Sequence, residues 1–218
     1  MSPLLYLLAF GFGLGNGITQ EDVPYIAFII PGIAALTSLS ASFSTTATRM
    51  NVQRLYYRSF DEMMMCPLSV PAIVVGKSIL GVVRGLISSG IIFAIGMMLA
   101  PELHFTPLFL ITLVISCFTF SFLGVAAALL AKSHASMATF SSLIILPMTF
   151  LCGTFFSLDN LPSVFQAALL TLPLTHSSTA LRAAALDSDF PWISLIVLSA
   201  FAVAFLLINI YLVKTKKV

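Results

Sequence analysis

Long apolar runs occupy most of this sequence, and they limit its fold more than any other feature. A membrane-spanning helix needs about 20 apolar residues, and the chain contains a succession of such runs separated by short polar loops. Only 8% of the residues are charged, whereas soluble domains carry roughly 25%. The runs are continuous rather than alternating, which favours helices over a β-barrel. They predict an all-α, polytopic membrane protein with spans at residues 24–46, 72–100, 107–131, 136–156 and 191–213.

Three further segments are apolar or helical in pattern but short. Pro3–Gly15 completes a predicted set of six spans, although at 1.5 Å per residue it reaches about 20 Å against a hydrocarbon core of about 30 Å. It also lacks a preceding basic flank, so we expect one membrane domain over residues 1–218 whose first span is truncated. Ser163–Leu172 and Thr175–Leu186 have the length of re-entrant or interfacial helices, here at the outer face.

Basic residues fall in alternate loops of this predicted topology. One set of loops holds eight Lys and Arg side chains, whereas the other holds Arg182 and most of the acidic residues. Because basic residues accumulate on the cytoplasmic side of a membrane, both termini are predicted to be cytoplasmic. The eight are Arg49, Arg54, Arg58, Lys77, Lys132, Lys214, Lys216 and Lys217.

The longest charged interruption lies between the second and third spans, from Arg49 to Ser69. Within it, apolar side chains recur at steps of three and four residues, which predicts an amphipathic helix over Asn51–Met65. Cys66-Pro67 ends this helix, because the residue before proline avoids the α region. The apolar positions are Val52, Leu55, Tyr56, Phe60, Met63 and Met64.

This amphipathic helix has two interpretations from its residues alone. A helix with a basic face can lie on an anionic membrane surface, but here Asp61 and Glu62 lie among the arginines. Tyr56, Tyr57 and Phe60 are large side chains of the kind that fill a groove on a partner protein. The periodicity alone does not decide between lipid and partner.

Arg84 is a base within the third span. It can be interpreted as a contact for an anionic substrate on its way across the membrane. In the structural alternative, which we favour at this point, its side chain extends to the inner headgroups or pairs with a neighbour. Arg182 is expected to pair locally with Asp187 or Asp189 at the outer face.

Patterns of catalysis and cofactor binding are weak. Gly76-Lys77-Ser78 is similar to the end of a phosphate-binding loop, but the position that requires the first glycine holds Pro71. The histidines and cysteines lack metal-ligand spacing, and no nucleophile elbow is present. The sequence therefore predicts no enzyme activity, no cofactor and no metal site in this chain.

Three motifs lie at the ends of the predicted spans. They are Tyr57-x-x-Phe60-Asp61-Glu62-Met63 with Pro67-Leu68-Ser69 after the second span, Gly153-Thr154-Phe155-Phe156-Ser157-Leu158 at the outer end of the fifth, and Leu172-Pro173-Leu174-Thr175-His176 before the last. In their order and spacing the chain resembles the permease subunits of ABC-2 type transporters. The similarity is greatest to the branch with nodulation-factor, polysaccharide and drug export permeases.

The resemblance implies an exporter driven from the cytoplasm. Two permease copies would pair in the bacterial inner membrane and bind separate ATP-binding cassette subunits, which would hydrolyse the ATP. The helix between the second and third spans would be the coupling helix that contacts the ATPase. The substrate would be an amphiphilic, lipid-linked, glycan or drug-like molecule. The coupling residues would be Tyr57, Phe60, Asp61, Glu62 and Pro67.

Other functions remain open at this point. A self-contained secondary carrier would use charged groups within broken helices, and a membrane-embedded lipid-modifying enzyme would need a catalytic constellation in the bilayer. A third alternative is an ATPase-coupled membrane anchor or sensor that transports nothing. Membrane lipids are expected partners in each case, and nucleic acid in none.

Overall fold

A computed structural model of the chain describes residues 2–12, 19–20, 23–151, 153–154, 162, 166 and 168–215. Within these residues the structure is nearly all helical, as predicted, and four helices are long and apolar enough to cross a membrane. They confirm the predicted spans at 24–46, 72–100, 107–131 and 191–213. These helices are α2 (Tyr25–Leu55), α4 (Val70–Leu99), α5 (Pro107–Leu130) and α10 (Trp192–Thr215).

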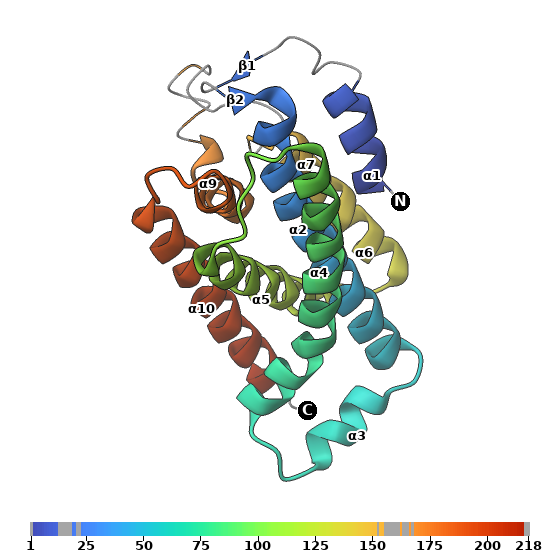
Figure 1. Cartoon of the computed structure of the whole chain (residues 1–218). Helices are drawn as coiled ribbons and strands as arrows, with labels where there is room; N and C mark the ends of the chain where they lie inside the picture. Colours follow the sequence, from blue (N-terminus) through green and yellow to red (C-terminus); the bar gives the residue numbers. More distant parts are fainter. Residues whose placement is uncertain are drawn as a thin grey trace.

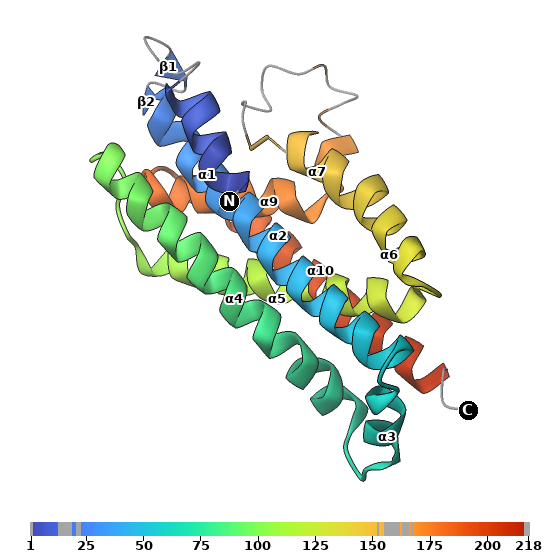
Figure 2. The ribbon, with the colours of Figure 1, turned by 90° about the vertical axis from the view of Figure 1, so that its right-hand side faces the viewer.

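Helix α2 is the centre of the bundle. In the most apolar 18-residue stretch of α2, 83% is buried inside the structure. In the same kind of stretch of α10, 11% is buried. The ribbon views show α2 running the length of the molecule with α4 along one side, while α5 and α10 lie across its other side (Figures 1 and 2). The exposed apolar side chains of α4 and α10 include Ile87, Ile91 and Ile196. Faces of this composition suit lipid or a second membrane helix as neighbour.

Small residues allow α2 and α4 to approach closely. A Cβ atom added at Gly81 would lie 2.0 Å from Oγ1 of Thr46, and one added at Gly85 would lie 2.0 Å from Oγ of Ser42. Further along α4, a Cβ at Gly96 would lie 2.3 Å from Cγ2 of Ile30. Glycine is thus required at these contacts, as is usual where membrane helices pack backbone to backbone.

The remaining two predicted spans are described only in part. The apolar helix that begins at His134 is described to Leu151, and its middle is a π-helical segment. The chain's first helical segment is described to Phe12. The predicted ends Gly15 and Phe156 lie outside the described residues. The elements are α1 (Ser2–Tyr6), η1 (Leu7–Phe12), α6 (His134–Phe140), η2 (Ser141–Ile145) and α7 (Leu146–Leu151), with β1 (Thr19–Gln20) paired antiparallel to β2 (Val23–Pro24).

Helix α9 (Pro173–Ala185) lies inside the bundle rather than at its outer surface. Every residue in it except Thr179 is buried against its neighbours, which include α2, α5 and α10. The Oγ atoms of Ser116 and Ser177 lie 2.7 Å apart and join α5 to α9. The prediction of a helix near Thr175–Leu186 is confirmed. Of the two predicted settings, re-entrant or interfacial, the burial of α9 argues against an interfacial helix, because its polar face is satisfied by protein. Of the predicted helix Ser163–Leu172, the structure describes residue 166 and residues 168–172.

The predicted helix Asn51–Met65 is divided into two pieces. Helix α2 continues to Leu55, a turn follows, and α3 (Ser59–Met65) begins after Arg58. Arg58 has φ 53°, in the left-handed region that interrupts a right-handed helix. The prediction of one continuous amphipathic helix is therefore wrong. The periodicity was satisfied on both sides of the turn, so it did not reveal the break.

Candidate functional site

An exposed aromatic pair marks the turn between α2 and α3. Tyr56 and Tyr57 are 75% and 66% exposed, and their rings meet edge to face with centroids 5.0 Å apart. The pair projects where the chain leaves α2, because Arg58 takes up a left-handed conformation and redirects the backbone. Large aromatic side chains held together in the open are typical anchors of a protein interface.

Phe60 of α3 points the opposite way, into the bundle. It is 5% exposed and belongs to a buried cluster with Met50 of α2, Ile73 of α4 and Leu129 of α5. The same cluster reaches Val213 of α10. Phe60 was predicted as one of the ATPase-coupling residues, and its ring lies behind the exposed surface. It joins α3 to a buried cluster to which all four spanning helices contribute.

The other predicted coupling residues lie around α3. Glu62 and Pro67 are exposed, on α3 and on the connection into α4. Asp61 lies within α3, but its side chain is outside the described part of the structure. Arg58, Met65 and Leu68 are also exposed here, beside Tyr56, Tyr57, Glu62 and Pro67. We call Tyr56, Tyr57, Glu62 and Pro67 the α3 surface.

Two hydrogen-bonded contacts tie the end of α2 to its neighbours. The guanidinium of Arg54 donates to the backbone carbonyl oxygens of Leu129 and Ala131, at the C-terminal end of α5. Nζ of Lys77 on α4 donates to Oε1 of Gln53 at 2.6 Å. A cation at a helix C-terminus is favourable because the free carbonyls carry partial negative charge. Sequence reasoning missed both contacts, since it treated Arg54 and Lys77 only as cytoplasmic charges.

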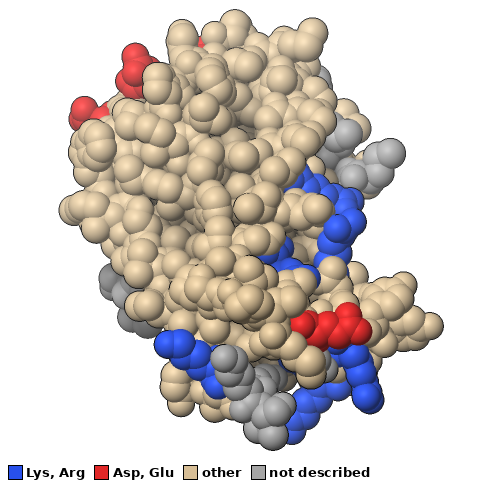
Figure 3. Space-filling view, turned by 90° about the horizontal axis from the view of Figure 1, so that it is seen from below, with Lys and Arg blue, Asp and Glu red and all other residues tan. Residues whose placement is uncertain are grey.

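Basic side chains gather at the end of the molecule that carries α3. Figure 2 shows α3, the start of α6 and the C-terminal end of α10 toward the same end. Seen from below, Lys and Arg side chains spread over this face, with acidic groups at few points (Figure 3). The exposed acids Glu102, Asp187 and Asp189 lie instead in the loops that follow α4 and α9. The charge asymmetry of the sequence is therefore an asymmetry in space.

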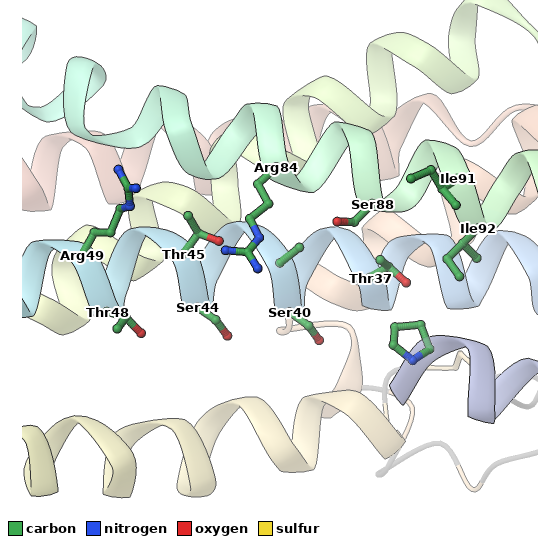
Figure 4. Close-up of a pocket in the computed structure, with 12 residues that line it drawn as sticks. Thr37, Ser40, Ser44, Thr45, Thr48, Arg49, Arg84, Ser88, Ile91 and Ile92 are labelled. Atoms are coloured by element: carbon green, nitrogen blue, oxygen red, sulfur yellow. The ribbon is translucent and has the colours of Figure 1, made fainter. Parts of the chain in front are cut away.

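A cavity of about 570 Å³ opens between α2 and α4, away from the α3 surface. Its wall on α2 comes from a stretch with eight Ser and Thr residues between Thr37 and Thr48. The hydroxyl groups of Thr37 and Ser38 turn back to carbonyl oxygens of their own helix. Thr37 nevertheless lines the cavity, together with Ser40, Ser44, Thr45 and Thr48 (Figure 4). We call this space the α2–α4 cavity.

Arg84 and Arg49 both line the α2–α4 cavity. In Figure 4 the side chain of Arg84 extends from α4 toward α2, and that of Arg49 extends from α2 toward α4. Both side chains are exposed. Arg84 therefore faces the polar wall of a neighbouring helix. Sequence reasoning named Arg84 but not Arg49, which it counted only as a loop base.

Arg182 lies in the interior of the described structure, and its charge is used structurally. Its Nε donates to the carbonyl oxygen of Phe28 at 3.1 Å, and one terminal nitrogen donates to that of Gly153 at 2.9 Å. The guanidinium also lies 3.7 Å from the centre of the Phe28 ring. Asp187 and Asp189, the expected partners, are exposed on the following loop. Arg182 thus holds α9 to α2 and to the segment after α7.

The described residues contain no group of three or more His, Cys, Asp or Glu side chains arranged to hold a metal ion. Gly76-Lys77-Ser78 lies within the continuous helix α4, and Oγ of Ser78 donates to the carbonyl oxygen of Val74. A phosphate-binding loop needs backbone N–H groups that are free of helical bonds. This triplet therefore does not form one.

Comparison with known proteins gives one family and a set of relatives. Residues 1–186 match the family described as ABC-2 type transporter. The chain is 27% identical over 208 residues to the inner membrane transport permease YadH of Escherichia coli strain K12, covering 94% of this chain and 81% of that protein. It is 31% identical over 196 residues to nodulation protein J of Sinorhizobium fredii, covering 85% and 71%. Nodulation protein J of Rhizobium meliloti is 29% identical over 199 residues, with 88% and 74% covered.

Proposed function

The chain belongs to the ABC-2 type transporter family, and from this premise we propose that it is the membrane permease subunit of an exporter driven by ATP hydrolysis on a separate subunit. It would work in the bacterial inner membrane, where the relative YadH is named as a transport permease. The chain itself would hydrolyse nothing. Two copies would pair, and each would bind one ATP-binding cassette subunit at its cytoplasmic end.

The exposed Tyr56–Tyr57 pair is the observation that carries this proposal. Two aromatic rings with two thirds or more of their surface exposed are costly to leave in water, so a covering partner is expected. The turn that holds them is short and lies beside Glu62, whose charge argues against insertion into lipid. A groove on a cytoplasmic protein could take both rings, as aromatic anchors commonly fill such grooves.

The α3 surface is attached to the spanning helices in a way that suits force transmission. Phe60 fixes α3 in the cluster shared by α2, α4, α5 and α10, and Arg54 joins α2 to the end of α5. The tight contacts at Gly81 and Gly85 make α2 and α4 move together. Closure of an ATPase dimer could therefore tilt this pair of helices and shift the permease between two arrangements.

The substrate path of the proposed exporter would include the α2–α4 cavity. Its hydroxyl-lined wall is an unusual surface for a membrane helix, because polar side chains there normally face protein or a water-filled path. Arg84 would belong to this path, as its functional interpretation requires. An amphiphilic substrate suits the setting, since exposed apolar faces adjoin the polar cavity.

The orientation follows from the same arrangement. The basic end with α3 would face the cytoplasm, and the segments 3–15 and 136–156 would complete six spans. Both termini would then be cytoplasmic. Cysteine labelling of Arg58→Cys and Glu102→Cys from each side of the membrane tests this, in a background whose native cysteines, including the exposed Cys66, are replaced by serine. Labelling of position 58 from the periplasm would contradict the proposed orientation and the coupling role together.

Co-purification tests the proposed partnership. The permease is extracted in mild detergent, and ATP hydrolysis by the purified complex is measured together with the identity of any ATP-binding cassette subunit. We expect such a subunit with the unaltered chain and with Tyr211→Ala, which removes an exposed tyrosine of α10. Tyr57→Ala, or Asp61→Lys with Glu62→Lys, should lose it while inserting normally. Export that continues in cells without any such subunit would favour a secondary carrier instead.

A further inference from the structure

We infer that the α2–α4 cavity binds the anionic headgroup of an amphiphile, through Arg49 and Arg84 together with the hydroxyl groups of α2. This inference rests on the proposed function, because it specifies the class of molecule that the exporter would carry. The shared chemistry is an oxygen-rich anion such as a phosphate or carboxylate.

Charge gives the sign of the ligand. The two guanidinium groups reach into the same space from opposite helices (Figure 4). None of the residues that line the cavity is acidic, and no hydrogen bond or ion pair of Arg49 or Arg84 is found in the described part of the chain. Two cations in one cavity repel each other, and an anion between them relieves that repulsion. A guanidinium also matches the oxygens of phosphate or carboxylate in pairs.

Hydroxyl groups supply further donors along one wall. Ser40, Ser44 and Thr48 recur at four-residue steps, which places them in a row on one face of α2. Thr45 of α2 and Ser88 of α4 line the same cavity. Ser44 and Thr48 are exposed. In Figure 4 the row points away from α4, whereas Thr45 lies on the same side of α2 as Arg84. Thr45 is therefore the α2 hydroxyl group beside the guanidinium groups, and the row adds donors elsewhere on the cavity wall for a headgroup with several acceptor oxygens.

The depth of Arg84 matches a headgroup that has entered from the inner leaflet. Helix α4 ends at Leu99, on the side away from α3. A crossing of about 20 residues counted back from there begins near Leu80, so Arg84 lies about 6 Å inside the proposed inner boundary. Arg49 lies closer to the α3 end of α2. The two charges could therefore guide a headgroup from the surface into the membrane.

Apolar surface continues from this cavity along α4. Ile87 and Ile91 are 58% and 55% exposed, one and two turns beyond Arg84. Ile91 also lines the cavity. An acyl or prenyl tail could lie along this strip while its headgroup contacts Arg84. The arrangement of a polar cavity beside an apolar strip is the reason for assigning an amphiphile rather than a soluble anion.

Lipid binding to the purified full-length chain tests the inference. Native mass spectrometry would count bound dioleoyl phosphatidic acid and dioleoyl phosphatidylcholine, which share their tails, and a third arm would add inorganic phosphate. We expect at least about a tenfold preference for phosphatidic acid, because charge-assisted hydrogen bonds are each strong enough for that factor. Arg49→Gln with Arg84→Gln should abolish the preference. Arg84→Lys should keep part of it, since it retains charge but loses the paired donors.

The matched control is Lys132→Gln, which removes an exposed cation from the turn between α5 and α6, outside the cavity. It should keep the full preference. Equal binding of the two lipids, an unchanged preference in the double arginine variant, or occupation by inorganic phosphate in place of phosphatidic acid would each overturn the inference. No ATPase is present in this lipid-binding experiment, so a negative result would overturn the headgroup site alone. The proposed exporter is tested separately, by co-purification of the ATPase subunit.

Discussion

The guanidinium of Arg54 donates a hydrogen bond to the backbone carbonyl oxygen of Leu129, so the cytoplasm-proximal end of α2 in the proposed topology is joined to the end of α5. A second bond from the same guanidinium reaches Ala131. The last carbonyls of a helix have no intrahelical partner, and here an arginine from another helix serves them. A movement of the α3 surface would therefore reach α5 as well as α4.

Arg54→Gln should weaken this junction. The shorter neutral side chain leaves one or both carbonyl oxygens without a donor, at a cost of about 1–3 kcal/mol. We expect a lower thermal midpoint for the detergent-solubilised chain. Arg58→Gln is the control, since Arg58 is exposed at the turn, and its midpoint should stay unchanged. Equal midpoints for the two variants would show that the Arg54 contacts do not contribute to stability.

Gly85→Ala should separate α2 from α4. Its Cβ would lie 2.0 Å from Oγ of Ser42 and 2.9 Å from Sγ of Cys117, so the helices must move apart. Overpacking of this kind costs about 1–3 kcal/mol. Gly90→Ala, on the same helix with no atom within 4 Å of the added Cβ, should change the thermal midpoint little.

A second substitution sharpens this test of the helix contact. Ser42→Ala removes the hydroxyl that lies nearest the added Cβ, so it should restore part of the stability lost in Gly85→Ala. The coupling between the two changes is measured as a double-mutant cycle of thermal midpoints. Strictly additive losses would mean that the close approach at Gly85 is not what the alanine disturbs.

The sequence predicted the parts of this fold that depend on hydropathy. Helices α4 and α5 begin and end within two residues of the expected spans, because an apolar run bounded by proline or polar residues leaves little choice. For α9 the sequence left a re-entrant and an interfacial helix open, since its Ser, Thr and Ala residues also suit a surface helix. Only the neighbouring helices reveal that they are satisfied inside protein, as in the contact of Ser116 with Ser177.

The candidate site was also predictable only where it depends on hydropathy. Arg84 stood out because a charge within an apolar run is rare. Arg49 and the hydroxyl row beside it did not, since α2 was expected to end at Thr46 and its pairing with α4 is a matter of three-dimensional packing. The break at Arg58 also left no trace, because a left-handed residue inside a helical pattern keeps the apolar periodicity on both sides.

Tyr57→Ala should affect partner binding without affecting stability. The ring is 66% exposed in the isolated chain, so its removal should change the free energy of unfolding by less than about 0.5 kcal/mol. If the proposed ATPase covers it, the loss in binding should be about 2–4 kcal/mol, typical of an aromatic hot spot. Affinity for the purified ATPase subunit measures this. Tyr211→Ala, equally exposed on α10, should bind as the unaltered chain does; equal affinities for both variants would remove Tyr57 from the interface.

Phe60→Ala should lower the stability of the chain while leaving ATPase binding intact, the reverse of Tyr57→Ala. This ring is buried among residues of α2, α4, α5 and α10, and its loss leaves a cavity costing about 3–5 kcal/mol. With its anchor gone, α3 should move independently of the spanning helices. We therefore expect an ATPase that still binds through Tyr57, but whose hydrolysis no longer drives export.

Phe60→Leu distinguishes this loss of coupling from simple unfolding. Leucine keeps most of the buried apolar volume, so it should recover stability and part of the export activity. The measurements are the thermal midpoint, ATP hydrolysis by the purified complex and export in cells. An alanine variant that is destabilised yet exports at the normal rate per folded molecule would show that α3 transmits no force through Phe60, and the proposed mechanical link would have to pass through Arg54 alone.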